Sequence, residues 1–181
     1  GRVAMLKKGV VSSICGLKVK EDTVEISPQT IQTKLKEYLD SNIRKYPFGG
    51  EGNVYGIVVH EYIAEYAAKL FDGSIPYECM DRRVFRLIWE HKKAMFERIR
   101  VLEDIINLNK RYADRYEQIV AEADKMRMLY ASHHMRRRDS VLPVIREKLL
   151  LLSKNERRIL TDLVKAIGKQ VDKNAVETSE K

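Results

Sequence analysis

Apolar residues recur at steps of three and four along most of the chain after residue 27, which is the spacing of one face of an α-helix. Residues 80–104 show the pattern most clearly, because the positions outside the apolar stripe carry many Lys and Arg side chains. The stripe predicted for this segment consists of Val84, Leu87, Ile88, His91, Met95, Ile99 and Leu102. A helix of this kind is stabilised by packing its stripe against other helices, so the pattern predicts a helical bundle.

Two further helices are predicted before residue 80. Ser27 can act as an N-cap with Pro28 in the first turn, and this helix is expected to run to about Ile43. Glycines and a proline within residues 46–53 then interrupt helical structure. The segment 54–73 is apolar around much of its circumference and ends at Gly73, so we expect it to be the most buried helix.

Two more helices are predicted after residue 104. Residues 112–129 continue the helical spacing. The last helix is expected to begin near Ser140 and to close at Gly168, and Ser153 and Glu156 match a capping box at which it would restart. The residues after Gln170 are polar and are expected to fray.

The first 26 residues differ from the rest, because two short β-branched runs are separated by turn-like residues. We therefore expect a mostly α fold, a bundle of about five helices with a small N-terminal β element. The predicted parts are a β-like segment 1–26, a helical domain 27–170 and a polar tail 171–181. Two strands alone are marginal in water, and the chain starts without Met; both observations favour a piece of a longer protein.

The composition indicates which kinds of partner the protein could bind. The chain has 181 residues, 44% of them hydrophobic, and a formal net charge of +8, which favours nucleic acid, an anionic membrane surface or an acidic protein as a partner. No run approaches the roughly 18 apolar residues of a membrane span, so none is predicted. The two cysteines form no CxxC pair, which favours a reducing, cytoplasmic location.

The residue patterns that catalysis or metal binding requires are not found in the sequence. His60 with Glu61, and His91 with Glu90, are direct neighbours, so each pair diverges by about 100° on a helix and cannot face one ion. Cys15 and Cys79 have no local base or oxyanion hole, and the glycine-rich loop at residues 47–53 lacks the Lys and Ser/Thr of a phosphate-binding loop. We expect no metal, no cofactor and no catalytic residue in this chain.

Two groups of basic residues are candidates for contact with a partner. The first lies outside the predicted stripe of residues 80–104 and consists of Arg82, Arg83, Arg86, Lys92 and Lys93. The second consists of Arg136, Arg137 and Arg138, which could contact phosphates if the protein binds nucleic acid. An ordinary solvated helix face is the simpler explanation of either group, and a self-associating helical scaffold is a further alternative.

Four segments in order carry a resemblance to a known family: VYGIVVHEYIAEYAAKLF, MDRRVFRLIWEHKKAMFERIRVL, YEQIVAEADKMRMLYASHHM and IREKLLLLSKNERRIL. Over residues 54–160 this pattern resembles the helical C-terminal region of butirosin-biosynthesis-protein-H-like proteins, which occur with nonribosomal peptide and related carrier-protein pathways. The resemblance implies a two-part protein whose N-terminal half has a cysteine-peptidase-like fold and carries the acyl-transfer nucleophile. No residue here matches that cysteine motif, so any such activity would need a missing N-terminal half.

The resemblance therefore implies a helical binding or substrate-shaping module of a carrier-protein-linked acyl or peptidyl transfer system. The implied partner is an acidic, phosphopantetheine-bearing carrier protein, whose encounter with a basic surface would be steered by charge. A nucleic-acid-binding regulator and a self-associating scaffold stay open as alternatives.

Overall fold

The computed structural model describes residues 27–41, 54–108 and 111–179. These residues form five α-helices and two short 3₁₀ helices, which confirms the predicted mostly helical bundle. The α-helices are α2 (Pro28–Asp40), α3 (Val59–Phe71), α4 (Val84–Ile105), α5 (Tyr112–Arg136) and α6 (Val141–Ser179), and the 3₁₀ helices are η2 (Gly56–Val58) and η3 (Tyr77–Cys79). The predicted β element falls in residues 1–26, outside the described residues.

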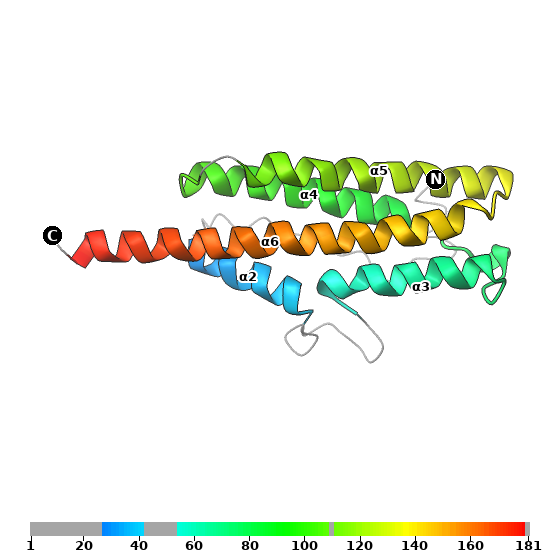
Figure 1. Ribbon diagram of the computed structural model, residues 1–181, viewed down its shortest axis with the longest axis horizontal. Coiled ribbons are helices and arrows are strands. Elements are labelled where there is room, and N and C mark those ends of the chain that lie inside the picture. The colour runs from blue at the N-terminus through cyan, green and yellow to red at the C-terminus, as the bar shows by residue number, and fades with distance from the viewer. Residues whose placement is uncertain (1–26, 42–53, 109–110, 180–181) are drawn as a thin grey trace, which may run out of the picture.

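The helices are arranged around α6. Helices α4 and α5 form a pair on one side of it, and α2 and α3 follow one another along the other side (Figure 1). Helices α2, α3 and α5 pack along α6, whereas α4 packs along α5. None of the described helices is long and apolar enough to cross a membrane.

Helix α6 supplies more of the described core than any other helix, which corrects the prediction that residues 54–73 form the most buried helix. In α3 the buried apolar residues are Ala64 and Ala67, because one face packs on α6 and the rest is at least partly exposed. The buried apolar residues of α6 are Leu142, Ile145, Leu149, Leu152, Ile159, Leu160, Leu163, Val164 and Ile167. A helix packed against three others must be apolar on several faces.

The predicted boundaries of the last helix are wrong, because α6 continues through both Ser153 and Gly168. Ser153 is buried inside the helix instead of capping it. Gly168 lies where α2 approaches α6, and a Cβ there would come within 2.7 Å of the Gln32 amide nitrogen. That nitrogen donates a hydrogen bond of 2.9 Å to the Val164 carbonyl. Gly168 therefore serves helix packing and not helix termination.

The start of α2 follows the prediction and its end does not. The Ser27 hydroxyl accepts a hydrogen bond of 3.1 Å from the Thr30 amide, which confirms the N-cap. The helix ends at Asp40, before the predicted Ile43, because Ser41 takes a left-handed conformation with φ +52°.

The buried stripe of α4 is rotated from the predicted one. Leu87 is 57% exposed, and His91 is also exposed. In their place Phe85 packs against Tyr130 of α5, with 4.6 Å between ring centroids, and Lys92 is buried. The buried residues of α4 are Phe85, Ile88, Lys92, Met95, Ile99, Leu102 and Glu103. This rotation brings a charged side chain into the protein interior.

Gly56 fixes the chain entering α3. Its φ is +73°, and a Cβ at this position would lie 2.4 Å from the Tyr38 carbonyl oxygen. Two residues later, the Val58 amide donates a hydrogen bond of 3.1 Å to the Ser41 hydroxyl. The start of η2 is thus held against the end of α2 by a backbone contact that only glycine permits.

We predict that Gly56→Ala destabilises the fold by about 2–5 kcal/mol, because the left-handed strain of about 1–2 kcal/mol adds to a clash with backbone. Gly73→Ala is the matched control, since Gly73 has φ +79° but open space around its Cβ position. Gly73→Ala should therefore lower the free energy of unfolding only by the left-handed strain of about 1–2 kcal/mol. Urea unfolding followed by circular dichroism measures both changes, and equal losses would contradict the close contact at Gly56.

Candidate functional site

Each of the five described α-helices contributes one polar side chain to a single interior cluster. The members are Tyr38 of α2, His60 of α3, Lys92 of α4, Tyr116 of α5 and Glu156 of α6. Glu156 and Tyr116 are fully buried, Lys92 is 2% exposed and His60 is 3% exposed. We call these five residues the central cluster.

An ion pair forms the middle of the cluster. The Lys92 ammonium lies 2.8 Å from Oε2 and 2.9 Å from Oε1 of Glu156. The Tyr116 hydroxyl donates to Glu156 Oε1 at 2.5 Å, and the Tyr38 hydroxyl donates to the same oxygen at 3.2 Å. Lys92 also donates to the Tyr38 hydroxyl at 3.0 Å. A buried charge is tolerated when it is paired and hydrogen-bonded in this way.

His60 completes the cluster as a neutral imidazole. Its Nδ1 lies 2.7 Å from the Ile57 carbonyl oxygen, an acceptor, so Nδ1 carries the proton. The other ring nitrogen, Nε2, lies 3.5 Å from Glu156 Oε2 and keeps its lone pair. The 3₁₀ turn that contains Ile57 therefore sets the tautomer and the orientation of His60.

Burial and charge act on the pKa of each member. Burial alone would raise the pKa of Glu156, but the Lys92 charge and the hydrogen bonds to the carboxylate outweigh it, so the pKa is lowered. Burial and then the Lys92 charge lower the pKa of His60 to about 4. Burial and the Glu156 charge raise the pKa values of Tyr38 and Tyr116. Burial lowers the pKa of Lys92, and the charge of Glu156 and its hydrogen bond oppose that fall. With Lys92 and Glu156 as an ion pair, the cluster holds one cation, one anion and three neutral groups at neutral pH.

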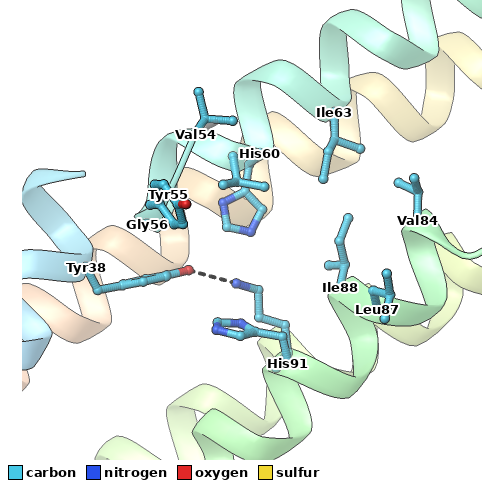
Figure 2. A pocket seen from close by; sticks show the side chains of 12 residues that line it. Tyr38, Val54, Tyr55, Gly56, His60, Ile63, Val84, Leu87, Ile88 and His91 are labelled. Atoms are coloured by element: carbon cyan, nitrogen blue, oxygen red, sulfur yellow. Dashed lines mark hydrogen bonds between the residues drawn. The ribbon is translucent and has the colours of Figure 1, made fainter. Parts of the chain in front are cut away.

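A pocket of about 450 Å³ opens beside the cluster, between α2, α3 and α4 (Figure 2). Five of the lining side chains carry polar atoms. Tyr38, His60, His91 and Lys92 gather at one place, and three of these four belong to the central cluster; the fifth is Tyr55. The rest of the lining is Val54, Gly56, Val59, Ile63, Val84, Leu87 and Ile88. A largely apolar pocket with a few polar groups at one place is typical of small-molecule sites.

His91 forms part of the polar group of this pocket. Its ring stacks on Tyr38 with 5.7 Å between the ring centroids and an angle of 26° between the planes. Although part of the residue is exposed, the protein atoms around the His91 ring displace water from it and lower its pKa, and the Lys92 charge adds to this effect. His91 is therefore a neutral imidazole at neutral pH, held flat against Tyr38.

The structure separates the first predicted basic group. Arg82, Arg83, Arg86 and Lys93 are exposed, but Lys92 is buried and so lies outside any contact surface. Arg83 pairs with Asp81 at 3.1 Å, and Arg86 pairs with Glu90 at 2.8 Å. The Lys93 ammonium lies 5.1 Å from the centre of the Trp89 ring. Three exposed arginines thus remain around the first turn of α4.

The second predicted basic group lies at the same end of the bundle. Arg136, Arg137 and Arg138 are exposed at the junction of α5 and α6. The Tyr77 hydroxyl lies 3.0 Å from Nδ1 of His134, and the Tyr130 hydroxyl donates to the Asp81 carbonyl at 2.9 Å. These bonds hold the chain before α4 against the end of α5. We call the six residues Arg82, Arg83, Arg86, Arg136, Arg137 and Arg138 the basic end.

The remaining candidates from the sequence are metal-binding groups and the two cysteines. Within the part of the chain that the structure describes, no group of three or more His, Cys, Asp or Glu side chains could hold a metal ion. Cys79 is an exposed free thiol, and Cys15 lies outside the described residues.

Sequence reasoning missed the central cluster, although a signal for it was present. Lys92 lies four residues after Ile88 and three before Met95, and Glu156 lies four after Leu152 and three before Ile159. Both charged residues thus occupy core positions of apolar stripes. A charged residue in such a position needs a buried partner of opposite charge, and the two sequence positions together indicate the pair.

Comparison of the chain with protein-family models, with curated proteins and with solved structures finds no match.

We predict that Lys92→Met destabilises the fold by about 3–5 kcal/mol, because it leaves the Glu156 carboxylate buried without a counter-charge. The double variant Lys92→Met/Glu156→Gln should recover much of this loss, since it removes both charges and keeps an oxygen acceptor for the tyrosines. Lys93→Met, at the exposed neighbouring position, is the control and should change stability by less than about 1 kcal/mol. Urea unfolding measures all three, and a double variant less stable than Lys92→Met would contradict the pairing.

We predict that stability falls as the pH drops from about 6.5 to about 4. The unfolded chain protonates His60 near its ordinary pKa of about 6.5, whereas the folded chain holds it neutral down to a pKa of about 4. The unfolded state therefore takes up a proton first, and the free energy of unfolding falls by up to about 3 kcal/mol over this range. His91, whose pKa is also lowered, adds a decline of the same sign.

Thermal and urea unfolding across this pH range measure the effect. His60→Asn keeps a side-chain N–H for the Ile57 carbonyl and should flatten the decline. His134→Asn, outside the central cluster, should leave it unchanged. A decline equally steep in His60→Asn would show that His60 does not cause it.

Proposed function

We propose that this helical domain is a binding module that holds an apolar small molecule or acyl group in the pocket between α2, α3 and α4. The observation that carries the proposal is the pocket of about 450 Å³ with its apolar lining and one polar group of Tyr38, His60, His91 and Lys92. Apolar surface such as that of Ile63, Val84 and Leu87 favours apolar ligands, since their transfer from water is favourable by about 25 cal/mol per Å² buried.

The basic end supports a more specific form of the proposal. Val84 and Leu87 line the pocket, and Arg83 and Arg86 directly precede them in the sequence. An acidic protein that docks on the basic end would thus stand beside an apolar pocket. This arrangement fits the expectation of a carrier protein that presents an acyl or peptidyl group.

The two alternatives considered from the sequence remain predictions. Nucleic-acid binding would use Arg136, Arg137 and Arg138, which are exposed, and it would show the steep salt dependence of phosphate contacts. Self-association would show as a mass that rises with concentration.

We predict that the neutral fluorescent probe N-phenyl-1-naphthylamine binds the protein and brightens on transfer into the apolar pocket. Ile63→Trp, which adds bulk to the lining, should weaken binding at least tenfold. Leu151→Trp is the control, because Leu151 is exposed on α6 and does not line this pocket. Fluorescence titration gives the affinities, and equal weakening by both variants would point to nonspecific binding.

We also predict that an acidic acyl carrier protein binds the chain at low salt. Replacing Arg82, Arg83 and Arg86 together by Gln should weaken binding at least tenfold, since charge steers the encounter. A matched triple replacement of Lys154, Arg158 and Lys165, exposed on α6, should have little effect. Isothermal titration calorimetry measures the affinity of both triple variants. If the unmodified chain gives no heat of binding, the carrier-protein form of the proposal is wrong, whereas binding of a small ligand is still tested by the fluorescent probe.

A further inference from the structure

The pocket contains a buried lysine, which would ordinarily suggest a site for a carboxylate or phosphate. Lys92 is unsuited to that task, because its partners lie within the protein. The Lys92 ammonium donates hydrogen bonds to Glu156 Oε1 at 2.9 Å and to the Tyr38 hydroxyl at 3.0 Å. Its charge is paired with the same carboxylate, whose Oε2 lies 2.8 Å away and accepts no hydrogen bond among the described residues. A bound anion would have to displace the Glu156 carboxylate.

The other charges of the site are also balanced. Among the described residues that line the pocket, Lys92 is the one with a charged side chain, and Glu156 behind it supplies one negative charge. His60 and His91 are neutral imidazoles, for the reasons given above. Arg98 and Arg157 act on the cluster from a distance and do not line the pocket. The pocket therefore presents almost no net charge to a ligand.

His91 differs from the other polar residues of the pocket. The hydroxyl of Tyr38 and the Nδ1 of His60 donate to Glu156 and to the Ile57 carbonyl, and the Nε2 of His60 faces Glu156 Oε2 at 3.5 Å. Within the described residues, His91 shows ring stacking on Tyr38 and no hydrogen bond through its ring nitrogens. A neutral imidazole offers one N–H donor and one acceptor, so His91 can bind a carbonyl or hydroxyl group of a ligand.

We infer that the pocket selects uncharged apolar ligands that carry an ester, thioester or amide group, and that it rejects the corresponding free acids and amines. The inference rests on the proposed function, since it names the ligand class of the same pocket. A carboxylate or ammonium group that entered would lose its hydration and gain no free counter-charge, because the Lys92–Glu156 pair is already closed. The pocket would thus hold an acyl group as its ester, thioester or amide and would bind the corresponding free acid weakly.

Displacement of bound N-phenyl-1-naphthylamine from the full chain tests this inference at pH 7.5. Four competitors of equal chain length are compared: methyl decanoate, decanamide, decanoate and decylamine, the last carrying an ammonium group. The ester and the amide should compete at least tenfold more strongly than either ion. Decanoate that competes as well as its methyl ester would overturn the inference and leave the proposed function standing. A probe that does not bind at all would overturn both.

A variant separates this mechanism from the general preference of apolar pockets for neutral molecules. Glu156→Gln keeps the size of the side chain but leaves the Lys92 charge uncompensated beside the pocket, so the affinity for decanoate should rise at least tenfold relative to methyl decanoate. Glu147→Gln, at an exposed position of α6, is the matched control and should keep the original preference. If Glu156→Gln does not fold, the four competitors measured on the unmodified protein still decide whether the pocket prefers uncharged ligands. Folded Glu156→Gln with unchanged preference would count against the role of the ion pair.

Discussion

The ion pair between Lys92 and Glu156 is the interaction on which the rest of the structure depends. It lies where the five described helices meet, and each helix contributes one side chain to it or to its surroundings. Two charges in the interior are stable only with close partners of fixed geometry. The position of each helix is therefore tied to the same few atoms, and a helix that shifted would leave a buried polar group without its partner.

The pocket follows from the way in which α4 is attached. Helix α4 packs along α5 and not along α6, so it reaches Glu156 of α6 through the long side chain of Lys92. Helices α3 and α4 consequently stand apart, and the space between them is the pocket. The side chains that face this space, such as Ile63 and Leu87, are those that a closer helix pair would have buried against each other. The buried ion pair and the pocket therefore both result from the packing of α4 on α5 instead of α6.

Much of the fold can be predicted from the sequence, because periodicity and capping are local properties. The N-cap at Ser27 and the helical segments are examples. The wrong predictions concern long-range packing. The sequence around Gly168 is typical of a helix end, and only the contact with Gln32 shows that this glycine allows α2 to approach α6. Lys92 reads as a surface residue when its helix is considered alone. Its burial depends on Glu156, 64 residues further along the chain, and such pairing leaves no local trace except a charge in an apolar stripe.

The central cluster also constrains when the protein can fold. Helix α6 follows the other described helices in the chain, and it supplies the carboxylate to which Tyr38, Lys92 and Tyr116 are bonded. A ribosome that adds about 5–20 residues per second exposes Lys92 and His60 for several seconds before Glu156 emerges. Until then α4 holds a positive charge on its apolar stripe with no partner. A lone charge on an apolar stripe disfavours burial of that stripe, so we expect the described helices before α6 to pack fully only once Glu156 is available.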